Sequence, residues 1–354
     1  MLKSGDISVV IQGLVDKSTV TTLKSIRKYL PNAEVILSTW ENSDISFLTD
    51  LYDVLVLNKD PGATVFETKE NKTNSINRII VSSKNGIDRA TRKYILRCRS
   101  DLALKNDNIL KLADDFSARN PEKSLFKQRV FAYEIFSIKY DIKNRHKQRM
   151  LFHISDWCYF GLKEDLQELF NIPLVQEPDF SRYFEKHNKN IQDIYSTRLW
   201  KMSPEQYITS VNAKKVFNNL KFDNYLNITE ENIQISENFI INNFRVFTQK
   251  SWGILTLKEE YKTIKMYAHS PFIYYSNAEQ LKDYKKYCDN TIETTEIQFL
   301  QKLYDIKYFE ALRKHFISFI YCKPIKKISE FISTMAYLFK FLFSLIKELI
   351  WKQK

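Results

Sequence analysis

Short apolar runs of strand length alternate with segments of helical spacing over the first hundred residues of the chain. The runs are rich in branched and aromatic residues, as buried strands are, and lie at residues 6–13, 34–38, 53–57 and 94–96. Residues 19–29 and 74–83 lie between them, and we expect Ser18 to cap the first of these two helices. This alternation predicts an α/β fold with an open, mostly parallel, twisted sheet flanked by helices.

Charged side chains follow the fourth of these runs. Arg97, Arg99 and Asp101 come directly after residues 94–96, and open α/β sheets place their ligands at the carboxyl ends of their strands. Arginines there can neutralise phosphate oxygens, and Asp101 can hold a hard divalent cation that shares substrate phosphates. An ordinary ion pair between arginine and aspartate at the strand end explains the same residues equally well.

The composition restricts how the chain can hold a nucleotide and what it binds. Only 6 of the 354 residues are glycine, and the sequence has neither a G-x-G-x-x-G nor a P-loop pattern, so a glycine-rich phosphate cradle is excluded. The net charge of +12 favours an anionic partner. Nucleotides, acidic glycans, membrane surfaces and nucleic acids all fit that description.

The cysteines indicate a protein of the reducing cytoplasm. Cys98, Cys158, Cys288 and Cys322 are widely spaced and form no C-x-x-C pair, so they predict neither a zinc site nor a disulfide framework. The first residues also lack the apolar core of a secretory signal peptide.

Residues 291–354 are predicted to form a helical, basic, amphipathic tail. Between Arg313 and Lys354 there are nine lysines and arginines and two glutamates. Lys340 and Lys347 interrupt the apolar residues there, which argues against a membrane span. A helix that lies on an anionic membrane surface through residues 313–354 fits better, and docking on the protein's own core is the alternative.

Several blocks, taken in order, carry a resemblance to a known family. They are residues 7–13, 30–41, 60–62, Asn74 with Asn77 and Arg78, 94–101, Asp156 and Trp157 with Phe160 and Gly161, and 204–207. With these blocks the chain resembles the WavE-type lipopolysaccharide-synthesis family over roughly residues 6–262. Ser38-Thr39-Trp40-Glu41 and Arg99-Ser100-Asp101 are the specific parts of the match.

The resemblance implies a bacterial glycosyltransferase with a GT-A-like fold. Residues 1–290 would form the transferase domain, with a nucleotide-binding half at about 1–105 and an acceptor half at about 106–290. Its partners would be a nucleotide-sugar donor and a glycan or glycolipid acceptor, such as lipopolysaccharide, lipooligosaccharide or capsule, with no nucleic acid. Its location would be peripheral, on the inner face of the cytoplasmic membrane.

The same resemblance implies residues for the donor site. GT-A enzymes hold a metal and the donor diphosphate with a D-x-D motif, and here the equivalent position reads Arg99-Ser100-Asp101. Asp101 is the candidate ligand of Mg²⁺ or Mn²⁺, although one carboxylate is a poor cage unless phosphates and waters complete the shell. Arg78, Arg97 or Arg99 are the alternative source of positive charge. The expected donor-binding residues are Gln12, Gly13, Glu41, Asn77, Arg78, Arg99 and Asp101.

Two acidic residues are candidates for the general base. Asp156 follows a buried run and precedes Trp157, so burial is expected to raise its pKa toward neutral pH. Glu205 is the second candidate, and its other explanation is a favourable position at a helix N-terminus after Ser203 and Pro204. His153, close to Asp156 in sequence, either assists or is simply packed.

Three other functions compete with glycosyl transfer. A sugar nucleotidyltransferase can use a similar sheet, and a catalytically inactive assembly protein would fit the missing first carboxylate of the D-x-D position. A nucleic-acid-binding protein is disfavoured, because the positive charge is concentrated in an apolar-faced tail without a recognised binding motif.

Overall fold

The computed structural model of the chain describes residues 2–143, 146–189, 197–257, 272–293, 312–313, 315–316, 319–320 and 324–351. The chain divides into two units. The first comprises residues 1–255 and 272–290, and the second comprises residues 256–271 and 291–354. The expected division at residue 290 into a transferase domain and a tail stays a prediction.

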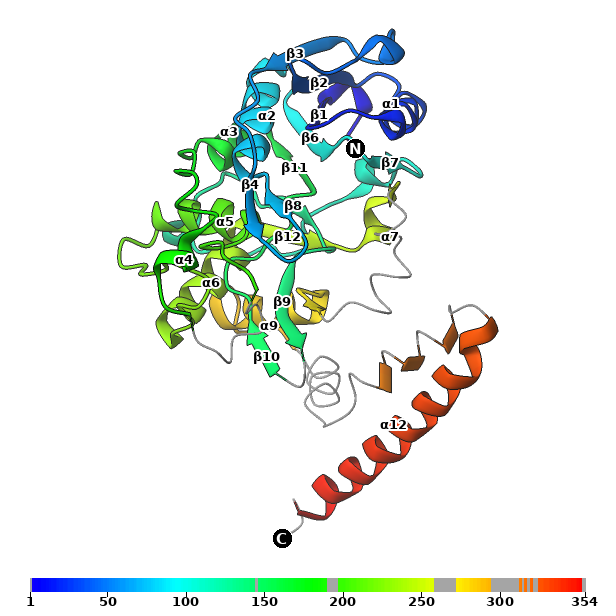
Figure 1. Cartoon of the computed structure of the whole chain (residues 1–354), viewed down its shortest axis with the longest axis vertical. Coiled ribbons are helices and arrows are strands. Elements are labelled where there is room, and N and C mark those ends of the chain that lie inside the picture. Colours follow the sequence, from blue (N-terminus) through cyan, green and yellow to red (C-terminus); the bar gives the residue numbers. More distant parts are fainter. Residues whose placement is uncertain are drawn as a thin grey trace. The chain divides into compact units, whose positions relative to one another are not determined.

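A sheet of seven strands forms the centre of the first unit (Figure 1), in the order β12-β8-β11-β6-β1-β2-β3. These strands are β1 (Ile7–Gln12), β2 (Glu34–Trp40), β3 (Val54–Asn58), β6 (Tyr94–Arg99), β8 (Val130–Tyr133), β11 (Cys158–Leu162) and β12 (Phe244–Phe247). Neighbours are parallel except at β11, which is antiparallel to both β6 and β8. The predicted α/β fold, with a mostly parallel sheet flanked by helices, is confirmed.

Three smaller sheets also occur among the residues that the structure describes. They are a hairpin of β4 (Thr64–Glu67) and β5 (Lys72–Asn74), a pair of β7 (Leu102–Leu104) and β13 (Ile254–Thr256), and an antiparallel group of β9 (Ile138–Lys143), β10 (His146–Arg149) and β14 (Phe272–Tyr274). The helices of the first unit are α1 (Lys17–Tyr29), α2 (Ile76–Arg89), α3 (Lys163–Phe170), α4 (Tyr183–Lys186), α5 (Pro204–Lys214), α6 (Glu230–Asn243), α7 (Gln249–Trp252) and α9 (Asn277–Tyr287).

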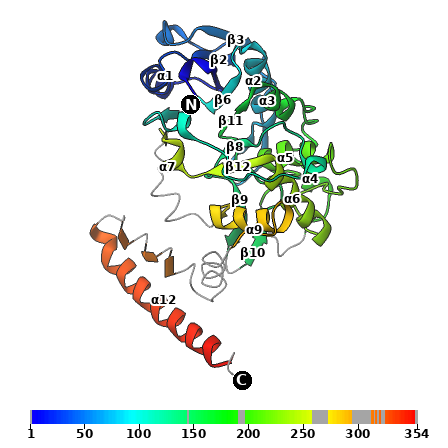
Figure 2. The ribbon, with the colours of Figure 1, turned by 180° about the vertical axis from the view of Figure 1, so that it is seen from behind.

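Helix α2 lies directly on the sheet. Figures 1 and 2, seen from opposite directions, both show α1 and α2 on opposite sides of β1 and β2. The contact is close at Gly86, where a Cβ would lie 2.5 Å from Cγ1 of Val10 and 3.0 Å from Cβ of Ser38. One turn earlier in α2, the hydroxyl of Ser82 donates a hydrogen bond to Oε1 of Gln12 at 2.7 Å. Helix α2 is thereby fixed against the carboxyl ends of the central strands.

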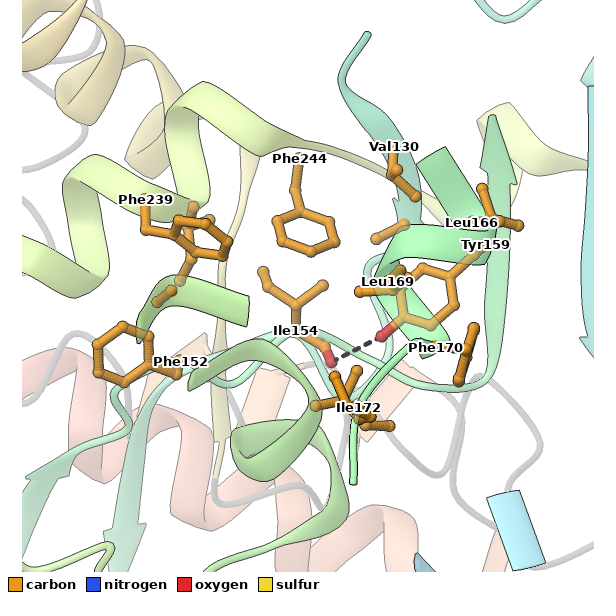
Figure 3. Packing of buried hydrophobic residues seen from close by; sticks show 14 of the residues in the cluster. Val130, Phe152, Ile154, Tyr159, Leu166, Leu169, Phe170, Ile172, Phe239 and Phe244 are labelled. Carbon is orange, nitrogen blue, oxygen red and sulfur yellow. Dashed lines mark hydrogen bonds between the residues drawn. The ribbon is translucent and has the colours of Figure 1, made fainter. Parts of the chain in front are cut away.

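A cluster of buried aromatic and branched side chains runs through the unit, and Figure 3 shows the part of it around β11, β12, α3 and α6. It joins β11, β12, α3 and α6 through Tyr159, Phe244, Phe170 and Phe239, which are fully buried. The hydroxyl of Tyr159 donates to the backbone carbonyl of Ile154 at 3.4 Å. This core holds the segment before β11 in place, and that segment carries Asp156.

Helix α12 (Pro324–Trp351) dominates the described part of the second unit. Its apolar side chains Ile328, Phe331, Ile332, Phe339, Leu342, Phe343 and Ile346 are exposed and share one face of the helix. Residues Lys326–Ile346 are long and apolar enough to cross a membrane, at a mean hydropathy of 1.3. The predicted helix is present at Pro324–Trp351, and most of residues 294–323 lie outside the described residues. By length and composition this helix passes as a candidate membrane span, against the expectation drawn from Lys340 and Lys347.

Residues 239–243 end helix α6, and the strand that follows is Phe244–Phe247. Residues 152–157 form no strand, since Phe152 has a φ of +56° and the strand starts at Cys158. One local expectation was wrong. Asp16, not Ser18, caps α1, because its side chain accepts from the Ser18 amide. The described cysteines Cys98, Cys158 and Cys288 are free thiols, and Cys322 lies outside the described residues.

Candidate functional site

The carboxyl ends of the parallel strands bring most of the expected donor-site residues to one edge. Gln12 at the end of β1 lies opposite Arg99 at the end of β6. Gly13 follows with a φ of +104°, which favours glycine, and its amide donates to the carbonyl of Ser38 on β2. Glu41 follows β2, is exposed, and is tied through its amide to the carbonyl of Asn58 at the end of β3.

Arg99 and Asp101 form a bidentate ion pair at this edge. Nε of Arg99 donates to Oδ1 of Asp101 at 3.0 Å, and Nη2 donates to Oδ2 at 2.7 Å. The guanidinium also stacks on Trp157, with Cζ 4.6 Å from the ring centre. The Asp101 side chain is 6% exposed and that of Arg99 is 28% exposed, so the cation faces outward and the carboxylate lies behind it.

The reversed direction of β11 brings Asp156 to the same edge. Because β11 is antiparallel to β6, the residues before β11 lie beside the residues that end β6. The amide of Arg99 donates to the carbonyl of Trp157 at 3.2 Å, and Nη1 of Arg97 donates to the carbonyl of Asp156. Hydrogen bonds to main-chain carbonyl groups thus join residues that are almost sixty positions apart in the sequence.

Arg97 supports this segment from inside the protein. Its side chain is fully buried, its Nε donates to the hydroxyl of Ser83 on α2 at 2.9 Å, and its Cζ lies 5.2 Å from the ring centre of Phe170. Burial lowers the pKa of Arg97, and the negative charge of Asp156 opposes that effect. These contacts give Arg97 a structural role beneath Asp156. Its buried guanidinium is not placed to contact a ligand at the surface.

Glu205 reaches the site from the first turn of helix α5. The expected start is confirmed: Ser203 caps the helix, Pro204 is its first residue, and Gln206 returns the capping bond. The side chain of Gln206 also donates to the carbonyl of Leu151 at 3.0 Å, which ties α5 to the segment that carries Asp156. Glu205 therefore lies in the first turn of helix α5, as expected, and close enough to the first candidate base for its charge to raise the pKa of Asp156.

His153 connects these elements. Its Nδ1 lies 2.9 Å from the carbonyl oxygen of Phe136, which can only accept, so Nδ1 carries the proton. The unprotonated Nε2 lies 4.0 Å from Oε2 of Glu205. Both Phe136 and Phe152 have positive φ, +68° and +56°, a costly conformation for large side chains. Backbone strain is thus concentrated around His153.

The titration of the three groups follows from their burial. Burial, and then the charge of Glu205, raises the pKa of Asp156 to about 6, as the sequence predicted in direction. Burial also raises the pKa of Glu205, and Arg99 and Arg198 are among the charges that oppose that rise. Burial lowers the pKa of His153 to about 4. Near neutral pH, Asp156 is a carboxylate with a high proton affinity beside a neutral imidazole.

Other predicted donor-site residues have structural partners. Arg78 forms a second bidentate pair with Asp60, at 2.7 and 2.6 Å, which lowers the pKa of that carboxyl. The side-chain amide of Asn77 donates from Nδ2 to the carbonyl of Val175 at 3.0 Å, and its Oδ1 accepts from the backbone amide of Val175 at 2.9 Å. These contacts explain Asn77 without a nucleotide, and its donor-binding role stays a prediction. Asp60 follows β3, so the Arg78–Asp60 pair also lies toward the carboxyl ends of the parallel strands.

One residue that acts on the site, Arg198, lacked a sequence signal strong enough to identify it. Arg198 is one of the charges that act on Glu205, its Nε lies 3.0 Å from Oε2 of Glu67, and its Cζ lies 4.9 Å from the ring of Trp200. Nothing in the spacing of these residues links them. Asp60 had a signal, since the Asp60-Pro61-Gly62 turn follows a strand and precedes the helix of Arg78.

The residues at Asp101 do not fit the D-x-D metal site. Among the described residues, no group of three or more histidine, cysteine or acidic side chains is placed to hold a metal ion. Both oxygens of Asp101 accept from Arg99, so a divalent cation would have to displace a guanidinium and then lie beside it.

Comparison with solved structures gives only distant likenesses. The glycosyltransferase GlyE of Streptococcus pneumoniae is 11% identical, over 85% of this chain and 64% of that one, with a TM-score of 0.31. TarS of S. aureus is 11% identical, over 94% and 79%, with a TM-score of 0.29. The 4-diphosphocytidyl-2C-methyl-D-erythritol synthase of Anaerococcus prevotii is 11% identical, over 60% and 99%, with a TM-score of 0.30.

Comparison of the sequence gives a family. No curated protein matches the chain significantly. The family described as WavE lipopolysaccharide synthesis matches residues 7–315, which includes the whole seven-stranded sheet and every candidate site residue. The chain belongs to the WavE lipopolysaccharide synthesis family.

Proposed function

We propose that this protein is a glycosyltransferase that moves a sugar from a nucleotide-sugar donor to a bacterial surface glycan. The observation that carries the proposal is the position of Asp156. It is a buried carboxyl with a pKa of about 6, on a segment hydrogen-bonded to the strand end that carries Arg99 and Asp101. A base and a fixed cation at one sheet edge are what transfer from an activated sugar requires.

Asp156 would act on the acceptor. The acceptor hydroxyl attacks the anomeric carbon, its proton passes to a carboxylate oxygen of Asp156, and the bond from the anomeric carbon to the diphosphate breaks with its electron pair on the leaving oxygen. A base whose pKa lies near the working pH both exists as carboxylate and accepts a proton readily. Glu205 acts beside it, since its charge contributes to the raised pKa of Asp156.

Lipopolysaccharide is a lipid-linked glycan, so the proposed acceptor would lie at a membrane, and helix α12 would offer a means of reaching it. Its apolar face is exposed, and the sequence around it is basic. We propose that α12 lies on the inner face of the cytoplasmic membrane, with its apolar side chains among the acyl chains and its lysines near anionic headgroups.

The test uses the full chain with a panel of nucleotide sugars and rough lipopolysaccharide as acceptor. Release of a nucleoside diphosphate that depends on the acceptor supports the proposal, and Asp156→Asn should abolish it. Glu164→Gln is the matched control, because Glu164 is an exposed acid on α3 paired with Lys127. Release of pyrophosphate from a nucleoside triphosphate and a sugar phosphate would instead identify a nucleotidyltransferase and refute the proposal.

A further inference from the structure

The Arg99–Asp101 pair has the same net charge as a D-x-D motif with its bound divalent cation. Two carboxylates with a divalent cation have no net charge, and one carboxylate with a guanidinium has none either. In both arrangements carboxylate groups hold the cation from the protein side. In this protein the guanidinium is the more exposed partner, and Asp101 is almost fully buried.

The guanidinium is also fixed in orientation. Asp101 holds it through two hydrogen bonds in its own plane, and the ring of Trp157 lies against its face at 4.6 Å. Such a bidentate and stacked geometry suits arginine and not lysine. The main chain at both residues is fixed as well, since the amide of Arg99 donates to the carbonyl of Trp157. A cation positioned in this way needs no reorganisation when a phosphate oxygen approaches.

From this geometry we infer that the guanidinium of Arg99, held by Asp101 and Trp157, takes the place of the divalent cation on the donor diphosphate, so that donor binding needs no metal. The inference rests on the proposed function, because it assigns a role within the donor site. Arg99 would then stabilise the negative charge that develops on the leaving diphosphate as the sugar departs. Asp101 would be a positioning residue that acts through Arg99.

The experiment measures binding of UDP, GDP, CDP and dTDP to the full chain by titration calorimetry, first with EDTA and then with Mn²⁺ or Mg²⁺. We expect at least one nucleoside diphosphate to bind in EDTA, with an affinity that neither metal increases. Binding that appears only with a metal would overturn the inference and leave the proposed function standing. If no nucleoside diphosphate binds in either condition, the proposed function fails, and the inference fails with it.

Variants at Arg99 separate its charge from its geometry. Arg99→Ala should weaken binding in EDTA roughly 10- to 100-fold, the usual effect of losing a hydrogen bond to a charged group. Arg99→Asp restores two acids in the D-x-D spacing, so its binding should be lost in EDTA and regained with Mn²⁺. Arg92→Ala is the control, because Arg92 is exposed at the opposite end of β6. Equal binding by the parent and Arg99→Ala would refute the role of Arg99.

Discussion

Nε2 of His153 lies 4.0 Å from Oε2 of Glu205, and this ring nitrogen has no proton because Nδ1 faces the carbonyl of Phe136. An ionised Glu205 therefore faces a lone pair, whereas a protonated Glu205 can share its proton with the imidazole. The contact favours the protonated acid, in the same direction as the effect of burial on the pKa of Glu205.

Removal of the proposed base should abolish transfer without unfolding the protein. Asp156→Asn keeps the size of the side chain and removes its ability to accept the acceptor proton, so turnover should fall by about 10²- to 10⁴-fold. Binding of the nucleoside diphosphate should change little, because Asp156 serves the acceptor. Transfer kinetics and calorimetry on the same preparation check both statements, and normal turnover would remove Asp156 from the mechanism.

The acid limb of the rate profile should follow the same group. Transfer needs Asp156 ionised, and its pKa is about 6, so the rate should fall as the pH decreases through about 6. A free aspartate would give that limb about two pH units lower. Measurement of turnover from pH 5 to pH 8 distinguishes the two, and Asp156→Asn should lose the limb together with the activity.

Stability should respond to pH in opposite directions at His153 and Asp156. The folded pKa of His153, about 4, lies below its unfolded value, so its contribution is present above pH 6.5 and is lost as the pH falls toward 4. The folded pKa of Asp156, about 6, lies above its unfolded value, so its contribution is present below pH 4 and is lost as the pH rises through 6. Each effect is at most about 3 kcal/mol, and the two nearly cancel.

Single variants should expose this cancellation. Relative to the parent, Asp156→Asn should gain stability as the pH rises from 4 to 7, and His153→Gln should gain stability as the pH falls over the same range. Urea unfolding at several pH values, followed by tryptophan fluorescence, measures the differences. Parallel pH profiles for the parent and both variants would contradict the buried titration of these groups.

The close packing of helix α2 against the sheet should depend on Gly86. A Cβ there would lie 2.5 Å from Cγ1 of Val10, so Gly86→Ala should destabilise the fold by about 1–3 kcal/mol through overpacking. Gly5→Ala is the control, because its nearest neighbour would be Cβ of Asn32 at 3.8 Å. Chemical denaturation of both variants tests the difference, and equal stability would show that α2 moves away without cost.

Membrane binding should depend on one face of α12. The double change Phe339→Glu and Phe343→Glu places two charges on the exposed apolar face and should weaken binding to phosphatidylglycerol vesicles roughly 100-fold or more. Ser333→Glu with Ser344→Glu adds the same charge to the polar face and should have a much smaller effect. Co-sedimentation of the full chain measures both. Equal losses would mean that net charge alone controls binding, and no binding by the parent would reject the membrane helix.

Local patterns predicted the first half of the sheet well. The strands β1, β2, β3 and β6 and the helices α1 and α2 occur where apolar runs and helical spacing placed them, with ends that differ by several residues. Parallel strands that are buried on both faces leave a strong signal, because nearly every residue in them must be apolar. The edge that carries Gln12, Gly13, Glu41 and Arg99 follows directly from that signal.

The second half required information that short segments do not contain. The run from Phe152 to Gly161 reads as one apolar strand, but Phe152 turns the chain and only the residues from Cys158 enter the sheet. Its antiparallel direction depends on the pairing of Cys158 with Cys98, a long-range contact. The sequence could propose Asp156 as a base, yet only the direction of β11 explains why that base lies near Arg99. The proximity of Arg198 and Glu205 is of the same kind.

The reversed strand β11 also limits how this protein can vary. Residues before 105 and residues after 150 are joined here by hydrogen bonds between the backbones of β6 and β11, so neither part is a module that can be exchanged alone. A chimaera that takes residues 1–105 from one relative and the remainder from another would combine Arg99 with a different partner in place of this chain's Trp157. Changes that leave this strand pair intact are therefore expected in the loops around it.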